Sequence, residues 1–165
     1  MKLFDFSESD PLVRCGIIND GVMGGLSMSR FEISGGGKAL FSGTVSLEHG
    51  GGFASVKTTP HRFDLGGYKG IRLRVKGDGK RYSFRIRMTE DIHCPAYEAP
   101  FGTVEGKWID SDLSFEAFRA VYKGRGVDGA DPLDPAGIVQ FGIMIKERQE
   151  GPFALEIERV EAWGG

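Results

Sequence analysis

Two neighbouring segments alternate strictly between apolar and basic residues, and this pattern limits the possible folds more than any other feature. Residues 70–77 have the sequence GIRLRVKG, and residues 81–88 have the sequence RYSFRIRM. A period of two places successive side chains on opposite faces of a strand, so each segment predicts a strand with one buried face. Asp78 and Gly79 lie between the segments, and this dipeptide favours the tight turn of a β-hairpin. The two segments are therefore predicted to be paired antiparallel strands.

Further short apolar segments, separated by turn residues, continue the pattern along the chain. Strands are expected at residues 2–6, 26–33, 39–47, 53–58, 96–101, 107–113, 139–146 and 152–160, with the second and third joined as a hairpin. Single helical turns are expected near residues 114–118 and 131–137, and no long segment has the period of a helix. The 26 glycines, about twice the usual ~7%, fall between these segments and are typical of turns. Residues 1–165 are therefore predicted to be a single all-β domain, a β-sandwich or jelly roll.

Charge and hydropathy exclude several classes of function. A net charge of −2 argues against a general nucleic-acid-binding protein, which would be strongly basic. No apolar run approaches the ~20 residues of a membrane-spanning helix. Residues 1–8 lack the apolar core of a signal peptide and the arginines of a transit peptide. Cys15 and Cys94 are far apart and do not suggest a disulfide framework. The sequence thus predicts a cytoplasmic protein with reduced thiols.

No arrangement of residues indicates catalysis, a cofactor or a transition-metal site. Residues 124–129 satisfy the G-x-G-x-x-G pattern, but they lead into Asp131 and Pro132 and not into the helix that a dinucleotide site requires. The three histidines are isolated from one another, and His93 and Cys94, although adjacent, would point to opposite faces of an extended segment. A nucleophile elbow of the G-x-S-x-G type is absent. The protein is expected not to be an enzyme and to bind no cofactor, while a structural Ca²⁺ in a glycine-rich loop stays an open alternative.

Two glycine-rich segments, residues 19–27 and 50–56, are candidates for recognition. The first has the sequence NDGVMGGLS, in which Asn19 and Asp20 precede an apolar Met23 set among glycines. The second contains Phe53 directly after three glycines. Glycine allows a backbone conformation or a close approach that a side chain would prevent. Two interpretations are open: a tight connection in which Met23 fills a gap in the core, or a shaped loop at the rim of a sandwich that binds a partner.

The basic residues of the two alternating segments would share one face if the segments formed a hairpin. These residues are Arg72, Arg74 and Lys76 in the first segment and Arg81, Arg85 and Arg87 in the second. Like charges on adjacent strands destabilise a sheet, so an opposite charge is required. Glu156 and Glu158 in the last strand could supply it as a ladder of ion pairs. Alternatively, an anionic or polar partner docks on this face, with help from Tyr82 and Tyr97.

Several of these segments together resemble a known family. They are residues 19–27, residues 41–47 (FSGTVSL), residues 50–56 (GGGFASV), residues 77–82 (GDGKRY), residues 118–126, and residues 142–145 (GIMI) with 151–153 (GPF). This set closely resembles the complex I intermediate-associated protein 30 family, and the resemblance extends over nearly the whole chain. It implies a galactose-binding-like β-sandwich of jelly-roll type. It further implies an assembly factor that holds membrane-arm intermediates of NADH:ubiquinone oxidoreductase, and this chain resembles a stand-alone bacterial member.

Two hypotheses about function follow. The first is a non-catalytic, chaperone-like module that binds a protein intermediate of a membrane complex through the rim loops and Met23, where an apolar patch is expected. The second is a module that binds a small polar ligand, most plausibly a carbohydrate. It requires a concave site where Trp108, Tyr82 or Tyr97 offers a ring face and an arginine, such as Arg85, or an aspartate supplies hydrogen bonds.

Overall fold

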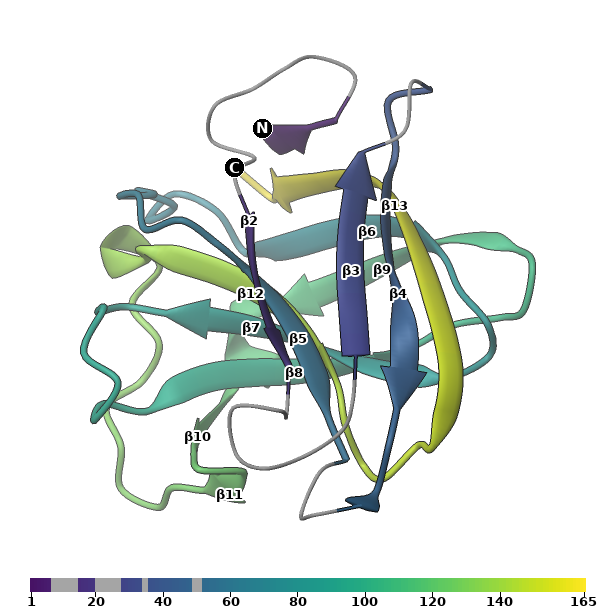
Figure 1. Ribbon diagram of the computed structural model, residues 1–165. Coiled ribbons are helices and arrows are strands. Elements are labelled where there is room, and N and C mark those ends of the chain that lie inside the picture. Colours follow the sequence, from purple (N-terminus) through teal and green to yellow (C-terminus); the bar gives the residue numbers. More distant parts are fainter. Residues whose placement is uncertain (7–14, 20–27, 34–35, 49–51) are drawn as a thin grey trace.

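The strands bury their apolar faces between two antiparallel sheets (Figure 1). The computed structural model describes residues 1–6, 15–19, 28–33, 36–48 and 52–165. Sheet A has the order β3-β4-β13-β6-β9, with β1 also paired to β13, and its strands are β1 (Lys2–Asp5), β3 (Met28–Ile33), β4 (Ala39–Val45), β6 (Gly70–Lys76), β9 (Trp108–Ser114) and β13 (Gly151–Trp163). Sheet B has the order β11-β10-β8-β7-β12-β5-β2, and its strands are β2 (Cys15–Asn19), β5 (Ala54–Thr58), β7 (Arg81–Arg87), β8 (Ala96–Gly102), β10 (Arg119–Tyr122), β11 (Arg125–Gly126) and β12 (Gln140–Ile145). The prediction of an all-β sandwich is confirmed.

The predicted hairpin between the two alternating segments is wrong. Both segments are strands, but β6 lies in sheet A between β13 and β9, whereas β7 lies in sheet B between β8 and β12. Two half-buried strands can bury their apolar faces either side by side in one sheet or facing each other across a sandwich, and this chain uses the second arrangement. The basic residues of β6 and β7 therefore point away from each other, toward opposite outer faces of the molecule.

Asp78 fixes the connection between β6 and β7. Its carboxylate accepts hydrogen bonds from the Tyr82 hydroxyl (3.1 Å), from the Lys80 amide (3.1 Å) and from the Ala154 amide of β13 (2.9 Å). Gly79 has φ +87°, a conformation that glycine adopts without strain. The Asp-Gly pair thus forms a turn, as its sequence predicts. This turn connects a strand of sheet A to a strand of sheet B and does not close a hairpin.

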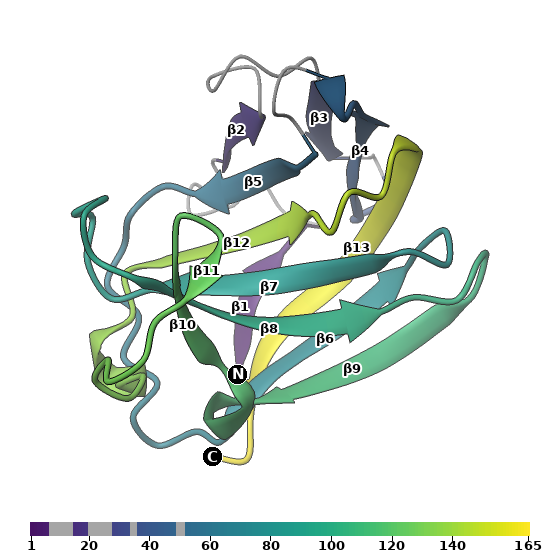
Figure 2. The ribbon, with the colours of Figure 1, turned by 90° about the horizontal axis from the view of Figure 1, so that it is seen from below.

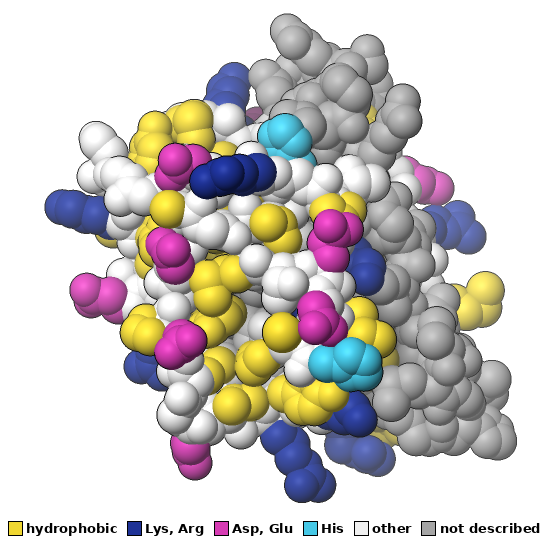
Figure 3. Space-filling model, turned by 90° about the vertical axis from the view of Figure 1, so that its left-hand side faces the viewer, with side chains coloured by type: hydrophobic (Ala, Val, Ile, Leu, Met, Phe, Trp, Pro, Cys, Tyr) yellow, Lys and Arg dark blue, Asp and Glu magenta, His cyan; other side chains and the backbone are white. Residues whose placement is uncertain are grey.

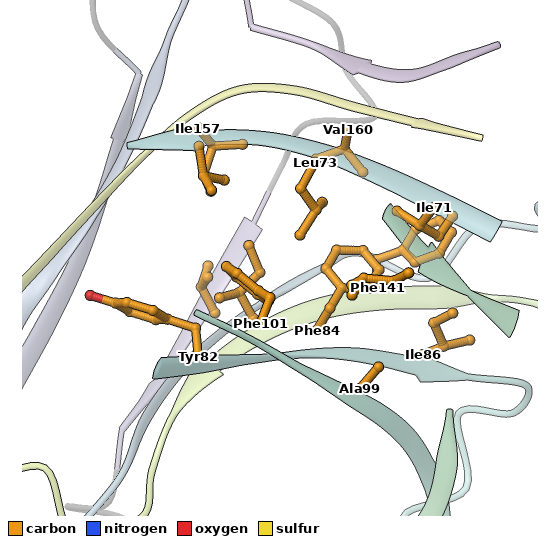
Figure 4. Close-up of a cluster of buried hydrophobic side chains, with 14 of the residues drawn as sticks. Ile71, Leu73, Tyr82, Phe84, Ile86, Ala99, Phe101, Phe141, Ile157 and Val160 are labelled. Atoms are coloured by element: carbon orange, nitrogen blue, oxygen red, sulfur yellow. The ribbon is translucent and has the colours of Figure 1, made fainter. Parts of the chain in front are cut away.

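The core between the sheets is made of aliphatic and aromatic side chains (Figure 4). Side chains of β6 and β13, such as Leu73 and Ile157, point toward Phe84 of β7 and Phe141 of β12. The rings of Phe84 and Phe141 lie 5.6 Å apart between centroids, a favourable distance for aromatic contact. The central strands β6, β7, β12 and β13 therefore send their apolar faces inward and their other faces to the two outer surfaces.

The remaining strand predictions are confirmed within one or two residues at most ends. The predicted hairpin of residues 26–33 and 39–47 corresponds to β3 and β4, which pair antiparallel. The predicted helical turns are 3-10 helices at Phe115–Ala117 and Pro135–Gly137. Strands β2, β10 and β11 were not predicted, and part of the G-x-G-x-x-G segment lies in β11. No helix in the described part of the chain is long and apolar enough to cross a bilayer.

The two ends of the chain meet on sheet A (Figure 1). β1 pairs with the C-terminal half of β13, and the amino group of Met1 donates a hydrogen bond to the Ala162 carbonyl at 3.0 Å. The long strand β13 pairs along its first half with β4 and along its second half with β1 and β6. It is therefore the central strand that holds sheet A together.

Candidate functional site

The outer face of sheet A carries a ladder of ion pairs. Every basic side chain of β6 lies close to a carboxylate of β9 or β13: Arg72 Nε is 2.6 Å from Asp112 Oδ1, Arg74 Nε is 2.7 Å from Glu158 Oε2, and Lys76 Nζ is 2.9 Å from Glu156 Oε2. The predicted ladder with Glu156 and Glu158 is confirmed for this strand. The Arg72 guanidinium holds the pKa of the Asp112 carboxyl below its usual range, chiefly through its hydrogen bond. Positive and negative charges balance on this face.

Trp108 lies on this same face at the start of β9, surrounded by cations. Lys38 Nζ is 5.0 Å from the centroid of its ring, and Lys76 Nζ is 5.3 Å away. At such distances a cation is attracted by the ring face. The Trp108 ring is therefore engaged by the protein's own cations.

The outer face of sheet B is different in both shape and charge. The strands β5, β12, β7 and β8 lie side by side in this order (Figure 2). Their registers place Lys57, Gly142, Arg85 and Glu98 in one row across the sheet. Gly142 therefore separates two cations by a position that has no side chain.

A hollow of about 470 Å³ lies over this row. Its floor is formed by Ser55, Gly142 and Met144, and its cationic wall by Lys57, Arg85 and Arg87. Phe53, Pro60 and Ile92 add apolar side chains, and Glu90 lies exposed in its lining. This volume is within the range of sites that hold small ligands or single side chains of a partner.

Glu98 neutralises part of the positive charge on this face. Its carboxylate is 3.4 Å from Arg85 Nη1 and also pairs with Lys146 Nζ. The residue is 9% exposed, so the pair with Arg85 is shielded from water. Burial lowers the pKa of Arg85, and the Glu98 carboxylate opposes this effect. One buried carboxylate is therefore shared by two cations.

Lys57 and Arg87 have no carboxylate partner among the described residues. Arg87 donates hydrogen bonds from Nη2 to the carbonyls of Asp91 (2.7 Å) and Cys94 (3.2 Å), which fix its position and leave its charge unpaired. Burial lowers the pKa of Lys57, and the positive charges of Arg87 and Arg85 lower it further. The outer face of sheet B thus carries an excess of positive charge held in place by the fold.

A second hollow lies where loop residues 127–135 pass near the 3-10 helix Phe115–Ala117. It measures about 740 Å³ and is lined by both charges, with Lys69 and Arg119 opposed by Glu116, Asp128 and Asp131. The Tyr97 hydroxyl donates a hydrogen bond to the Asp131 carbonyl, at 2.5 Å, and closes one wall of this hollow. Charges of both signs line this hollow, so it favours neither an anion nor a cation.

The side of the molecule that lies at the left of Figure 1 has a surface on which apolar and charged side chains are mixed (Figure 3). Hydrophobic side chains gather there with carboxylates and histidines among them, and most lysines and arginines lie toward its margins. Ile92, in the loop between β7 and β8, is 71% exposed. Exposed apolar groups thus occur near the hollow of sheet B, but they are interrupted by charge.

The structure brings together two of the predicted site residues, Phe53 and Arg85, which both line the hollow of sheet B. Tyr82 is 1% exposed in the core, and Asp78 binds its hydroxyl, so its ring is not presented to a partner. Tyr97 is also buried and lines the other hollow, while Trp108 lies on the opposite sheet. The side chain of Asn19 and the whole of Asp20 and Met23 lie outside the described residues.

Sequence reasoning missed Lys57, Arg87 and Gly142 as members of this site. Arg87 was noted only as one of a row of basic residues, and Lys57 and Gly142 lie in strands with no unusual pattern. The signal that unites them is the register of β5, β12 and β7, which local sequence does not specify. Among the described residues, no three His, Cys, Asp or Glu side chains gather as they would around a metal ion.

Sequence comparison connects the chain to one family over almost all of its length. Residues 4–157 match the family described as Complex I intermediate-associated protein 30. The mitochondrial proteins of that name are 29% identical in Drosophila melanogaster, over 96% of this chain, and 27% identical in Mus musculus, over 94%. An uncharacterized protein of Schizosaccharomyces pombe is 30% identical over 88% of this chain and 75% of its own length. The match spans 61% of the fly protein and 54% of the mouse protein.

Among solved structures, carbohydrate-binding modules share the fold. The family 11 module of a Clostridium thermocellum cellulosomal cellulase superposes with a TM-score of 0.74, covering 100% of this chain and 94% of the module, at 16% sequence identity. The same type of module in complex with a mixed-linked tetrasaccharide gives 0.72, covering 99% and 95% at 17% identity. The chain therefore has the same β-sandwich fold as these modules, and at this identity the likeness concerns the fold alone.

Proposed function

Because the chain belongs to the Complex I intermediate-associated protein 30 family, we propose that it is a non-catalytic assembly factor that binds protein intermediates of a respiratory complex I-like membrane complex. The observation that carries this proposal is the family match over residues 4–157. The fold, which it shares with binding modules, agrees with a role in binding and not in catalysis.

The outer face of sheet B supports protein docking as the mode of action. It combines a hollow, unpaired cations held by the fold, and apolar side chains at the rim, whereas the outer face of sheet A is balanced in charge. Protein interfaces commonly use arginine, methionine and aromatic side chains in this way. We propose that a partner protein docks on this hollow through Phe53, Arg85 and their neighbours.

The alternative function is binding of a carbohydrate or another small polar ligand. Its support is the shared fold with carbohydrate-binding modules. Such a site needs exposed rings on which a sugar can stack, and the three aromatic residues predicted for this purpose lie in the core, at the other hollow and on the opposite sheet. Within the described residues, the docking of a protein therefore has the better geometric support.

The proposal is tested by affinity capture from solubilised membranes of the native cell, using the whole chain with a tag. Subunits of NADH:ubiquinone oxidoreductase are expected among the specifically retained proteins, as quantified by mass spectrometry against a tag-only control. A parallel glycan array tests the alternative. Absence of these subunits, together with binding of a defined glycan, would replace the assembly function by the carbohydrate function.

A further inference from the structure

We infer that the hollow of sheet B recognises an acidic peptide segment of its partner, with one carboxylate placed over Gly142 between Lys57 and Arg85. The inference rests on the proposed function, because it names the chemistry of the partner that this function requires. Three features of the hollow carry it: the gap above Gly142, the excess of positive charge around that gap, and the apolar rim beside it.

The gap follows from the register of three strands. Lys57 and Arg85 both pair with Gly142, from opposite sides, so their backbones are about 10 Å apart, which is twice the usual strand spacing. A Cβ atom on Gly142 would lie 2.9 Å from the Val56 carbonyl oxygen and 3.4 Å from Lys57 Cβ. The glycine thus keeps the surface low between two long cationic side chains. A carboxylate placed there can accept hydrogen bonds from both.

The charge around the gap favours an anion. Lys57, Arg85, Arg87 and Lys146 lie on this face, and Glu98, the buried carboxylate among them, is already engaged with Arg85 and Lys146. Glu90 is exposed in the lining and forms no ion pair with another described residue. The Arg87 side chain is fixed by carbonyls, so little conformational entropy is lost when it meets an anion. Burial and then the charges of Arg87 and Arg85 lower the pKa of Lys57, and an incoming carboxylate would offset both effects.

The rim favours a peptide over a sugar. Ile92 and Pro60 offer aliphatic surface, and Met144 offers a flexible thioether that adapts to varied apolar side chains. Phe53 is half-buried, whereas Phe141, the other aromatic residue of the lining, is buried in the core. An acidic segment with interspersed apolar residues matches both the cations and this rim. A polyanion without apolar groups would contact only the cations and not the apolar rim.

The test uses fluorescence anisotropy with the full chain and a labelled peptide that alternates glutamate and leucine. Replacing Lys57 by methionine keeps the stem of the side chain and removes its charge, so we expect binding to weaken about tenfold, or about 1.4 kcal/mol. The matched control is Lys76→Met on sheet A, which removes the same charge from the balanced face and should leave binding unchanged. Binding of the wild type should also fall as salt is added, because the contact is electrostatic.

Three outcomes would overturn the inference. They are equal binding by the wild type and Lys57→Met, equal binding of a peptide with glutamine in place of glutamate, and binding of polygalacturonate or inorganic phosphate without binding of the peptide. The thermal midpoint of each variant shows that the comparison is made between folded proteins.

Capture from solubilised membranes separates this inference from the proposed function. If Lys57→Met retains complex I subunits as well as the wild type does, the assembly function stands and the acidic-segment inference fails. If the peptide binds as expected but no such subunits are recovered, the inference stands and the assembly function fails.

Discussion

The two outer faces of the sandwich are built from similar residues but are organised in opposite ways. On sheet A, each basic residue of β6 meets a carboxylate of a neighbouring strand within 3 Å. On sheet B, Arg85 and Lys146 share the buried carboxylate of Glu98, while Lys57 and Arg87 meet none among the described residues. Sheet A shows that carboxylates of neighbouring strands can pair with every basic residue of a strand. The excess of positive charge on the outer face of sheet B therefore points to a role outside folding.

The outer faces of the two sheets also differ in shape. Strands β6, β9 and β13 cover sheet A with long paired side chains, whereas Gly142 and Ser55 leave sheet B hollow beneath its cations. The comparison agrees with the proposal that the face of sheet B binds a partner, whereas the ion pairs on sheet A stabilise the fold. Substitutions on both faces test this contrast, beginning with the variant that should lose the most stability.

Glu98→Gln should have the largest effect on stability. It removes the carboxylate shared by Arg85 and Lys146 at a buried position, and leaving a buried charge without its partner costs about 3–5 kcal/mol. The free energy of unfolding, measured by urea denaturation, should fall by this amount. Asp110→Asn is the control on sheet A, where the side chain is half exposed and the loss should be below about 1 kcal/mol. Similar losses in the two variants would contradict the contrast.

Gly142→Ala should have the next largest effect. Its Cβ atom would come within 2.9 Å of the Val56 carbonyl oxygen, so β5 must move away from β12, which costs about 1–3 kcal/mol. Gly102 at the end of β8 is the matched control, since a Cβ atom there meets nothing within 4 Å. Chemical denaturation of both variants gives the comparison. Equal stability of the two variants would show that the floor of the hollow is not tightly built.

Lys76→Met should lower the free energy of unfolding, whereas Lys57→Met should not. Lys76 loses an ion pair with Glu156, which costs about 0.2–1 kcal/mol at a partly exposed site. Lys57→Met removes the cost of burying the charge and the repulsion from Arg87 and Arg85, so this variant should be as stable as the wild type or slightly more stable. Destabilisation of Lys57→Met by as much as Lys76→Met would mean that Lys57 is already paired.

The effect of Lys57 should also depend on pH. Because its pKa is lowered in the folded state from 10.5, the folded protein releases this proton first, and the penalty is present at neutral pH. The penalty should disappear as pH rises through the folded pKa toward 10.5. Unfolding free energies of the wild type and Lys57→Met, compared from neutral to alkaline pH, should therefore converge. A constant difference over this range would show that neither burial nor repulsion penalises the charge of Lys57.

Asp112→Asn should have the smallest effect, and it should be confined to one pH range. The folded-state pKa of Asp112 is lowered by Arg72, so its contribution to stability is present above the unfolded pKa of about 3.9 and is lost as pH falls through the folded value. The side chain is exposed, so solvent screens the pair. The wild type and variant should differ in stability at neutral pH and coincide in strong acid. A difference that persists in acid would assign the effect to packing.

The sequence predicted which residues face outward better than it predicted which strands are neighbours. Alternation of apolar and basic residues correctly identified β6 and β7 and their buried sides, and the charges of Glu156 and Glu158 correctly indicated partners for β6. Alternation does not distinguish strands that pair in one sheet from strands that face each other. The pairing partners of β6 and β7, and the contact of Asp78 with Ala154, come from parts of the chain that are far away in sequence.

The candidate site was predictable only in part for the same reason. Phe53 and Arg85 were selected by residue type and do line the hollow. The row of Lys57, Gly142 and Arg85 depends on the registers of three strands, and no local pattern specifies those registers. Trp108 shows the converse case, because its residue type suggested a binding platform but neighbouring lysines cover its ring.

The most direct test of the account is lysine footprinting of the chain alone and in its captured complex. Acetylation of Lys57 and Lys76, measured by mass spectrometry, reports which outer face the partner covers. We expect the acetylation rate of Lys57 to fall in the complex, while that of Lys76 stays the same. Protection of Lys76 with no change at Lys57 would place the partner on sheet A and contradict the account.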